Sequence, residues 1–509
     1  MWRGFNLVNG AWRNDCAAQM HVVDPLNGER FIEQPHTSVD ELAPFVASLA
    51  QVPKSGVFNV FKRPEMFLLW GDVNAKLASE LAKPEVERFF CRLIQRVMPK
   101  SYTQARNEVV VTRKFLENFS GDQVRFLARS FGVAGDHAGQ MSTGHRWPYG
   151  PVAIIAPFNF PLEIPVLQLM GALYMGNKPL VKPSENVSIV VEQWARFMHA
   201  CGAPLDAFDL IHCQGRVMGE LLARAPLRMT QFTGSSRVAE LLARQLAGRI
   251  KIEDAGFDWK VLGPDVPADA ALRRHVAWQC DQDAYAASGQ KCSAQSILFA
   301  HDNWLRAGLL DDLECRAAQR KLDDLTIGPV LTHTTQGILE HAARLAAIPG
   351  ARVLFGAHEL KQHTIPKQYG AVAPTAVFVP LAELVKPAHF ELCTTEIFGP
   401  FQVVTSYGDA DTGRVIEALE RMHHHLTAAI VSNDATFINR FLGSSVNGTT
   451  YAGLLARTTA APQNHWFGPA GDPRGAGIGS PEAIKLVWSC HREVIYDWGP
   501  IPPTAGKLS

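Results

Sequence analysis

Hydrophobic and polar positions follow different patterns in successive parts of the 509-residue chain. A short pair of strands is expected near the start. Apolar side chains then recur three and four positions apart over residues 64–83 and 112–131, which predicts amphipathic helices that form a scaffold. Residues 132–150 are polar and glycine-containing, and we expect an extended hairpin that projects from the body. Because unpaired strand edges bind partners, this hairpin is interpreted as a subunit contact.

Beyond residue 150, short apolar runs alternate with helical patterns, which predicts a parallel, doubly wound sheet of the nucleotide-binding kind. The alternation continues to about residue 251 and begins again at residue 253. Strand candidates in the second part lie at residues 294–300, 375–380 and 425–434, and a last one lies at residues 485–498. Since the chain is too long for one core, we expect two α/β lobes with a cleft between them.

Composition narrows the expected ligand to a small molecule. Lys plus Arg and Asp plus Glu both number 49, and neither sign forms a long block, so no nucleic-acid partner is expected. The nine cysteines are scattered without metal-ligand spacing, which argues against disulfides and a zinc site and favours a reducing compartment. The side chains of His423, His424 and His425 would diverge on a helix or strand, so no metal is expected there.

Neither a signal peptide nor a transit peptide is visible in the first residues, which lack an apolar core and an Arg- and Ser-rich amphipathic stretch. The most apolar stretch, residues 151–175, contains Asn159, Glu163, Gln168 and four prolines. We interpret it as a buried strand followed by the start of a helix, and we expect no membrane partner.

Cys292 is the candidate nucleophile. It stands in the run SGQKCSAQS at residues 288–296, directly after Lys291 and among small residues that leave an open approach. A reactive cysteine needs thiolate character, access and nearby hydrogen-bond donors. The alternative is a free cysteine that only fills a small buried site.

Polar residues also follow the first strands of the nucleotide-binding pattern. Asn159 ends an apolar strand beside Pro157 and Pro161, where its amide either donates to a developing oxyanion or forms a turn. Lys182 and Glu185 follow the next strand, at the edge where doubly wound sheets bind ligands. A carboxylate there binds ribose hydroxyls and repels a 2′-phosphate, so Glu185 favours NAD over NADP. A loop ion pair is the alternative.

A third turn, FTGSS at residues 232–236, places Gly234 and Ser235 before an amphipathic helix. Exposed amides at a helix N-terminus suit a pyrophosphate, although an ordinary helix cap uses the same residues. The sequence contains neither GxGxxG nor GxxxxGK[ST], so the common dinucleotide and phosphate-loop motifs do not apply.

Two more carboxylates are expected at the cleft. Glu253 ends a short alternating strand and precedes a turn that begins at Ala255, so we choose it over Asp254 as the general base. Glu396 and Phe398 lie two apart on an extended segment and therefore share a face. One of them is expected to bind a ribose and the other to pack on a ring.

These motifs, in this order, resemble the aldehyde dehydrogenase superfamily: PFNFP, KPSE, FTGS, a base glutamate, GQKCS and EIFGPF. Longer runs such as EDAGFDWKVLGPDV, WQCDQDAYAASGQKCSAQS and KLVWSCHREVIYD are similar to the plant-type Δ1-pyrroline-5-carboxylate dehydrogenases, and the similarity extends over nearly the full chain. The resemblance implies NAD-dependent oxidation of glutamate-γ-semialdehyde to glutamate in proline catabolism. The run around Glu253 departs from the usual ELGGK in a form that the plant-type branch shares.

The resemblance also implies residue roles. Cys292 attacks the aldehyde, Asn159 and the Cys292 backbone N–H hold the oxyanion, and Glu253 activates the water that hydrolyses the thioester. The residues expected to bind NAD are Pro157, Phe158, Lys182, Ser184, Glu185, Gly234, Ser235, Glu396 and Phe398. The residues expected to grip the substrate are Glu163 for its ammonium group and Ser293, Gly475, Ala476, Gly477 and Ser480 for its carboxylate. The glycines serve equally well if they only turn the chain.

The expected fold is α/β and aldehyde dehydrogenase-like, with two doubly wound parallel-sheet domains and a small oligomerisation hairpin and strand. Residues 1–131 and 149–252 form the NAD-binding domain, 253–450 the catalytic domain, 451–480 the substrate-anchor loops, and 132–148 with 481–500 the oligomerisation elements. We expect a homo-oligomer, either a dimer or a dimer of dimers. It is expected in the mitochondrial matrix if the source is eukaryotic and in the cytoplasm otherwise.

Three alternatives stay open from the sequence. The thioester passes to CoA in one of them, although the apparent base Glu253 argues against that route. In the second, another small semialdehyde is the substrate. The third is a structural protein that keeps the fold without the chemistry, against which the joint presence of Cys292, Asn159 and Glu253 argues.

Overall fold

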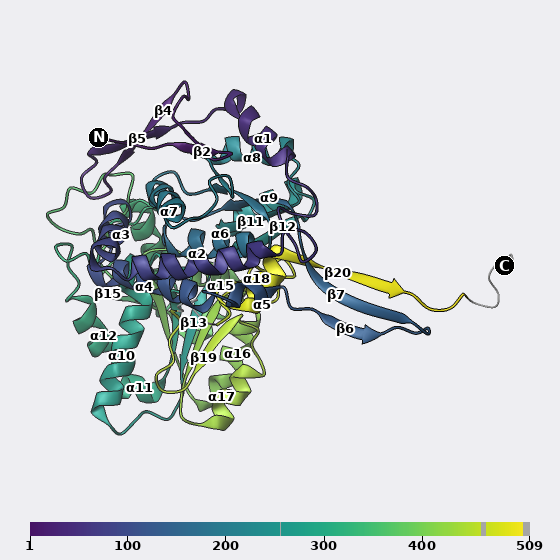
Figure 1. Cartoon of the computed structure of the whole chain (residues 1–509). Coiled ribbons are helices and arrows are strands. Elements are labelled where there is room, and N and C mark those ends of the chain that lie inside the picture. The colour runs from purple at the N-terminus through teal and green to yellow at the C-terminus, as the bar shows by residue number, and fades with distance from the viewer. Residues whose placement is uncertain (255, 460–464, 502–509) are drawn as a thin grey trace.

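The computed structural model describes residues 1–254, 256–459 and 465–501. Two α/β lobes carry a long three-stranded arm that projects to one side (Figure 1). Ala255, expected to begin a turn, and residues 460–464 of the expected anchor region lie outside the described residues.

The first lobe is built on a seven-stranded sheet. Its strands lie in the order β12 (Ile250–Asp254), β11 (Met229–Gly234), β8 (Pro151–Ile155), β9 (Lys178–Lys182), β10 (Asp209–Leu210), β2 (Asn6–Val8) and β3 (Ala11–Arg13). The strands from β8 to β12 pair in parallel, and β2 joins β10 antiparallel. The pattern after residue 150 therefore forms the predicted doubly wound sheet, although β12 extends two residues past the expected boundary at residue 252.

Helices cover both faces of this sheet. The connecting helices are α6 (Glu163–Tyr174), α7 (Ile189–Ala200), α8 (Gly215–Arg224) and α9 (Ser236–Gln245). The N-terminal scaffold contributes α1 (Ala43–Ala50), α2 (Glu65–Leu81), α3 (Pro84–Val97), α4 (Tyr102–Asn118), α5 (Gln123–Leu127), the 3-10 turn η1 (Val39–Glu41) and a small sheet of β1 (Trp2–Arg3), β5 (Arg30–Pro35) and β4 (Gln19–Val23). Every residue of α6 is buried, because scaffold helices α2 and α4 pack against it.

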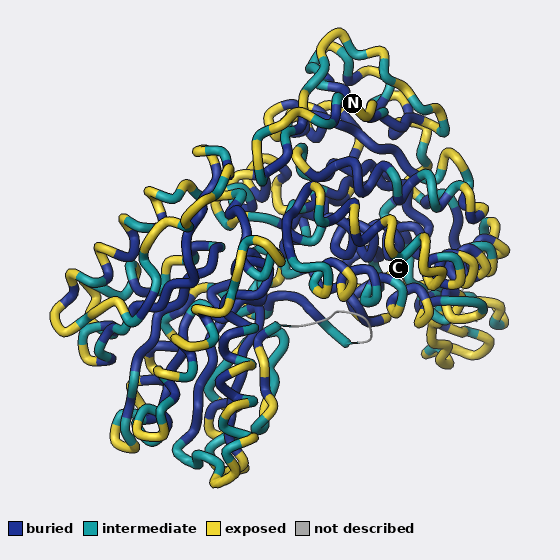
Figure 2. The backbone as a smooth tube through the Cα atoms, turned by 90° about the vertical axis from the view of Figure 1, so that its left-hand side faces the viewer, coloured by how far each residue is buried: buried dark blue, intermediate teal, exposed yellow. Residues whose placement is uncertain are grey.

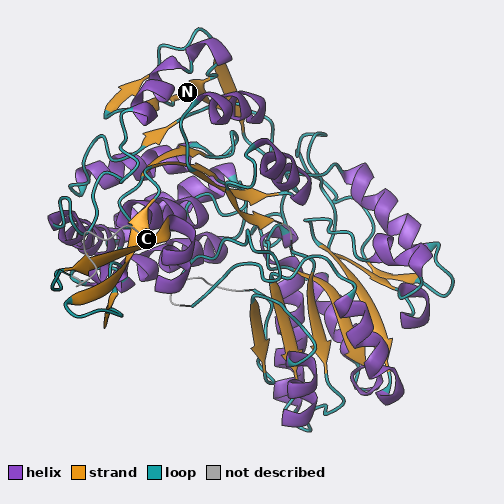
Figure 3. Ribbon diagram, turned by 90° about the vertical axis from the view of Figure 1, so that its right-hand side faces the viewer, coloured by secondary structure: helices purple, strands orange, loops and turns teal. Residues whose placement is uncertain are grey.

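The second lobe repeats the arrangement. Its strand order is β15 (Arg352–Phe355), β16 (Thr375–Phe378), β17 (Phe401–Tyr407), β14 (Gln295–His301), β13 (Asp258–Leu262), β18 (Thr427–Val431) and β19 (Thr449–Ala452), with only β15 antiparallel among the described strands of this sheet. The helical elements are α10 (Ala270–Tyr285), η2 (Ala286–Gly289), α11 (Asp302–Arg306), α12 (Leu309–Ala317), α13 (Thr335–Ala346), α14 (Leu381–Leu384), α15 (Pro387–Cys393), η3 (Asp409–Asp411), α16 (Thr412–Glu420) and α17 (Ala435–Leu442). The helices flank the sheet strands (Figure 3), and the central strands are buried (Figure 2).

The arm joins distant parts of the chain. It contains β6 (Phe131–Ala134), β7 (Gln140–Pro148) and β20 (Ser489–Asp497), all antiparallel, with β7 in the centre. The hairpin prediction is confirmed, but the strand expected at residues 485–498 begins only at Ser489. Residues before it form α18 (Pro481–Trp488), because Ser480 accepts a hydrogen bond from the Ala483 N–H and a proline occupies the first helical position.

No helix in the described part of the chain combines the length and the apolar character needed to cross a membrane.

Candidate active site

One cavity of about 1160 Å³ is lined by residues of both lobes. In the first lobe, its walls come from the carboxyl ends of β8, β9, β11 and β12 and the residues that follow them, where a doubly wound sheet binds ligands. The lining includes the three expected catalytic residues, Cys292, Asn159 and Glu253, and all nine residues expected to bind the cofactor: Pro157, Phe158, Lys182, Ser184, Glu185, Gly234, Ser235, Glu396 and Phe398. The fold thus gathers twelve residues that are spread over about half of the chain.

Cys292 lies just after a tightly wound turn. Ala287, Ser288 and Gly289 all have left-handed backbone angles, with φ of 54°, 56° and 66°. Left-handed non-glycine residues are strained and persist where the surroundings hold them, often at functional sites. A Cβ atom at Gly289 would lie 1.9 Å from the Gly399 carbonyl oxygen, so the turn packs directly against the segment that carries Glu396.

Side chains of the turn hold it to the neighbouring segment 328–331. Ser288 Oγ accepts a hydrogen bond from the Gly328 N–H at 2.8 Å. Gln290 donates through Nε2 to the Pro329 carbonyl at 3.0 Å and accepts at Oε1 from the Leu331 N–H at 2.7 Å. These hydrogen bonds hold the turn before Cys292 in place against residues 328–331 of the same lobe.

The thiol of Cys292 is half-buried and lies among carboxyl groups. Burial raises its pKa well above the ordinary value, and Glu253 raises the pKa further. Lys291 does not face the thiol. Its ammonium donates to the Gln282 carbonyl at 2.8 Å and to Thr459 Oγ1 at 3.0 Å. Burial therefore disfavours the thiolate, and adjacency to a lysine in the sequence is no guide to the ionisation of Cys292.

Glu253 is the base within reach. It occupies β12 and is buried, and neither of its carboxylate oxygens has a hydrogen-bond partner within the described structure. Burial raises the pKa of Glu253 to about 7, while the neighbouring Cys292 thiol opposes that rise. A Cβ atom at Gly256 would lie 1.9 Å from the Cys292 carbonyl oxygen, so the segment after β12 touches the nucleophile through bare backbone. Asp254, the rejected alternative, also lines the cavity.

The cofactor end of the cavity has an open helix N-terminus. Ser235 is the N-cap of α9 but its side chain makes no capping hydrogen bond, and the neighbouring Ser236 hydroxyl is buried without a partner. Unsatisfied amides at such an end bind phosphate groups. Lys182 and Glu185 form an ion pair at 2.9 Å, and both line the cavity. An anion-binding helix end together with a carboxylate fits a dinucleotide.

The residues expected to grip the substrate are not in the cavity lining. The Gly475 N–H donates to the Asp472 carbonyl at 2.9 Å and the Ala476 N–H to the Ile252 carbonyl at 2.7 Å. Both amides thus have partners inside the protein, and their role as an anion nest stays a prediction. A Cβ at Gly477 would lie 2.6 Å from the Trp466 ring, which is a packing reason for that glycine.

The other three residues have different surroundings. Ser480 caps α18, and Ser293 is buried directly after the nucleophile. Glu163 is buried at the start of α6, and burial, followed by the neighbouring Glu108, raises the pKa of the Glu163 carboxyl well above its usual value. Such a shift weakens the case for Glu163 as the partner of an ammonium group.

Sequence reasoning missed several lining residues. Thr332 and His333 come from the segment after the Gln290 contacts, and Leu426 precedes β18. The change from the apolar run at residues 329–331 to Thr332 and His333 was a usable signal. Ile164, inside the apolar start of α6, has no such signal.

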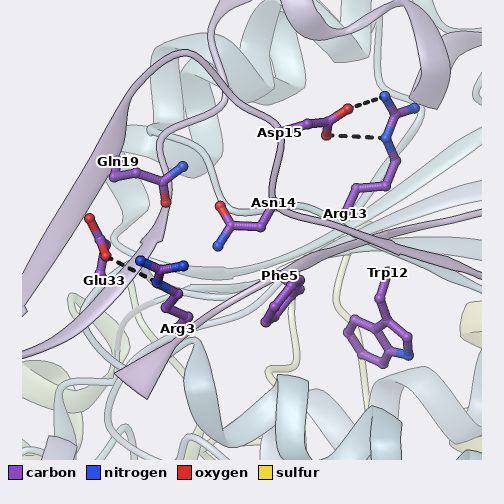
Figure 4. Close-up of a pocket in the computed structure, with 8 residues that line it drawn as sticks. All are labelled: Arg3, Phe5, Trp12, Arg13, Asn14, Asp15, Gln19 and Glu33. Atoms are coloured by element: carbon purple, nitrogen blue, oxygen red, sulfur yellow. Dashed lines mark hydrogen bonds and ion pairs between the residues drawn. The ribbon is translucent and has the colours of Figure 1, made fainter. Parts of the chain in front are cut away.

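A second hollow of about 680 Å³ lies at the N-terminal strands (Figure 4). Its two arginines are each paired with a carboxylate, Arg3 with Glu33 at 3.6 Å and Arg13 with Asp15. The local charges are therefore balanced. Within residues 1–254, 256–459 and 465–501, no cluster of three or more His, Cys, Asp or Glu side chains is arranged to hold a metal ion.

A doubly wound lobe with an open phosphate-binding helix end, joined to a lobe that presents a cysteine beside a carboxylate, defines a dinucleotide-dependent oxidoreductase with a thiol nucleophile. Residues 12–468 match the aldehyde dehydrogenase family, and the chain belongs to that family. The family and the fold predicted from the sequence are thereby confirmed.

Relatives are close in sequence. The chain is 63% identical over 497 residues to a probable aldehyde dehydrogenase of Linum usitatissimum, covering 97% of this chain and 89% of that protein. It is 62% identical over 498 residues to Delta-1-pyrroline-5-carboxylate dehydrogenase 12A1, mitochondrial, of Arabidopsis thaliana, covering 98% and 89%. The crystal structure of an NAD-dependent aldehyde dehydrogenase from Sinorhizobium meliloti superposes with a TM-score of 0.84 at 21% identity, over 98% of this chain and 96% of that one, which supports the fold.

Proposed function

We propose that the chain oxidises L-glutamate-γ-semialdehyde, the open form of Δ1-pyrroline-5-carboxylate, to L-glutamate with NAD. The observation that carries the proposal is the joint position of Cys292, Asn159 and Glu253 in one cavity with a dinucleotide-binding helix end. The substrate is supported by the name and the 62% identity of the Arabidopsis relative.

The first chemical step uses the contact between Glu253 and Cys292. Glu253 takes the thiol proton, since burial and the neighbouring carboxyl raise the pKa of the thiol and so disfavour its spontaneous ionisation. The thiolate then attacks the aldehyde carbon, and the negative oxygen accepts hydrogen bonds from the Asn159 amide and the Cys292 backbone N–H. Loss of one such donor commonly lowers the rate by about 10²–10³-fold.

The second step releases the acid. Bound NAD supplies the acceptor for the hydride that leaves the substrate carbon. Glu253, with a pKa of about 7, first releases the thiol proton to solvent and then, as a carboxylate again, removes a proton from the water that attacks the thioester, so that Cys292 leaves as the thiolate. The same carboxylate therefore serves as base for the thiol and for the water.

The residues that would hold NAD come from both lobes. The amides after Gly234 and Ser235 take the pyrophosphate, and Lys182 and Glu185 take the adenosine ribose. We prefer NAD to NADP because the Glu185 carboxylate repels a 2′-phosphate, although its pairing with Lys182 weakens that repulsion. Pro157, Phe158, Ser184, Glu396 and Phe398 complete the proposed contacts.

Of the residues expected to grip the substrate, only Ser293 is carried forward as a proposal, because it adjoins the nucleophile. We further propose a homo-oligomer, a dimer or a dimer of dimers, built through the arm. A mitochondrial location is proposed on the printed name of the Arabidopsis relative.

The test is the formation of NADH from chemically prepared pyrroline-5-carboxylate by wild type, Cys292→Ala and Cys315→Ala. Cys315 is exposed and serves as the matched control cysteine. We expect activity in wild type and Cys315→Ala, none in Cys292→Ala, and a lower rate when NADP replaces NAD. Glutamate as product both with and without CoA excludes acyl transfer to CoA. Wild-type enzyme that oxidises simple aldehydes and leaves pyrroline-5-carboxylate untouched would contradict the proposed substrate.

A further inference from the structure

We propose that the buried ion pair between Lys100 and Glu108 positions Asn159 for binding the oxyanion. The inference rests on the proposed aldehyde oxidation. Neither charged residue lines the cavity, so both are positioning residues and not catalytic ones.

The pair lies behind the active site. Lys100 stands between α3 and α4, and Glu108 lies in α4. Both side chains are fully buried, and Lys100 Nζ lies 2.7 Å from Glu108 Oε2. Removing two charges from water is unfavourable, and apolar side chains of similar volume often stabilise a protein as well or better. The pair therefore calls for a reason other than stability.

Its remaining hydrogen bonds all reach one turn, residues 159–163, between β8 and α6. Lys100 Nζ donates to the Asn159 carbonyl oxygen at 2.9 Å. Glu108 Oε1 accepts from the Leu162 N–H at 2.8 Å and from the Glu163 N–H at 3.1 Å. The ammonium holds the start of the turn, and the carboxylate holds its end.

Each contact suits the group it binds. The Leu162 and Glu163 amides stand at the start of α6, where helix amides lack partners within the helix and favour a negative charge. The Lys100 ammonium also lies 4.3 Å from the centre of the Phe160 ring, inside the same turn. Four of the five residues of the turn are thus contacted by the pair.

The mechanical consequence falls on the Asn159 amide. An oxyanion donor must be held in place before the reaction, and a displacement of about 1 Å can lower a rate by about 10²-fold. Charge-assisted bonds at both ends of a five-residue turn leave its first residue little freedom. Since the pair has no net charge, it restrains Asn159 without neutralising Glu253.

The test is a cycle of variants between the ion pair and Asn159. The double variant Lys100→Met with Glu108→Gln keeps the side-chain volumes and the net charge while it removes the ammonium bond to Asn159. We expect kcat to fall about 10²-fold with little change in the affinity for NAD. Glu117→Gln is the matched control, because Glu117 lies on the exposed side of α4 in an ion pair with Lys114. It should leave kcat unchanged.

The decisive comparison is made in the Asn159→Ala background. If the pair acts through Asn159, the double variant adds no more than about a twofold further loss there. The inference is overturned if the double variant lowers kcat equally in the wild-type and Asn159→Ala backgrounds. It is also overturned if the double variant leaves kcat unchanged in the wild-type background. Should the double variant fail to fold, Glu108→Gln alone goes through the same cycle with the same two outcomes.

All variants are assayed with pyrroline-5-carboxylate and with a simple aliphatic aldehyde. Suppose that the enzyme is inert toward pyrroline-5-carboxylate and that, with the simple aldehyde, the double variant loses kcat only when Asn159 is present. This result supports the positioning role and contradicts only the proposed substrate. Turnover of pyrroline-5-carboxylate, with an equal loss of kcat in the wild-type and Asn159→Ala backgrounds, supports the proposed substrate and contradicts the positioning role.

Discussion

Glu253 and Cys292 affect each other unequally: the carboxyl raises the pKa of the thiol, whereas the thiol lowers the pKa of the carboxyl. Only one negative charge is therefore favourable at this point of the cavity. The charge moves from Glu253 to the thiol as the reaction begins. The low solvent exposure of Glu253 thus tunes its carboxyl to accept a proton near neutral pH.

A pH dependence of kcat follows from this raised pKa. Burial favours the protonated carboxyl, so Glu253 is an inactive acid below a pH of about 7 and an active base above it. We expect kcat to rise with pH through about 7, and we call this rise the limb of the pH profile. Glu253→Gln should abolish the limb and lower kcat by about 10²–10⁴-fold. NADH formation measured across pH checks both points.

Asp254→Asn is the control for the neighbouring carboxylate and should keep the limb. A limb near pH 7 that persists in Glu253→Gln and disappears in Asp254→Asn would assign the base to Asp254 instead.

At the scale of secondary-structure elements, two chain segments contact the nucleophile turn through glycines, where no side chain separates the backbones. The segment after β12 touches the Cys292 carbonyl at Gly256, and the segment after α15 touches the turn at Gly289 through Gly399. The nucleophile turn is therefore wedged between these two segments. Its position depends on elements that carry no reacting atom.

Gly256→Ala tests this wedge. The new Cβ would lie 1.9 Å from the Cys292 carbonyl oxygen, and backbone on both sides cannot move as a flexible side chain does. A displacement of about 1 Å at Cys292 should lower kcat by about 10²-fold or more, while NAD binding persists because Gly256 does not line the cavity. Steady-state kinetics and NAD titration measure the two effects.

Gly413→Ala is the matched substitution. Gly413 lies in α16 with open space around its Cβ position, so alanine should leave kcat unchanged and raise stability slightly. A Gly256→Ala enzyme with normal kcat would show that the two segments are free to move apart.

The same elements show what the sequence could predict. Buried parallel strands are continuous apolar runs, and their carboxyl ends share one edge, so the residues after β8, β9 and β11 were found together. Cys292 and Glu396 were found through motifs of small and polar residues in turns that are buried or partly buried. The sheet topology and the cofactor edge of the cavity were therefore predictable.

Features that depend on contacts between residues far apart in the chain could not be predicted from the sequence. The run Gly475-Ala476-Gly477 has the composition of an anion nest, but the Gly475 and Ala476 amides bind the Asp472 and Ile252 carbonyls, which composition does not reveal. Lys100 and Glu108 lie more than 50 residues before the turn they hold, as the separation of 59 between Lys100 and Asn159 shows. The apolar run at residues 485–488 fits a strand or a helix equally well, and the cap at Ser480 decided for the helix.

At the scale of the whole molecule, the arm leaves apolar side chains in solvent. Phe131 is 49% exposed, Val133 53% and Ile495 62%. Strands β6 and β20 form the two outer edges of the arm sheet, and their edge positions and apolar side chains suit the subunit contact that we propose.

Charged residues on this surface should separate the subunits. We expect Val133→Lys with Ile495→Lys to lower the solution mass toward that of one chain, since burying a lysine in an apolar interface is unfavourable. Analytical ultracentrifugation measures the mass, and NAD titration checks that the distant cavity is intact. Leu205→Lys, at an equally exposed leucine outside the arm, is the control and should change neither. A double variant with the wild-type mass would place the subunit contact elsewhere.

The arm also links the fold to the order of synthesis. β7 pairs along its whole length with β20, and Ser142 on β7 contacts Glu493 on β20 across 351 residues of sequence. While the ribosome is still translating the second lobe, β7 is already made and has β6 alone as a neighbour, with its other edge open to any passing strand. Completion of the arm, and with it the surface proposed for assembly, must wait until β20 has been translated.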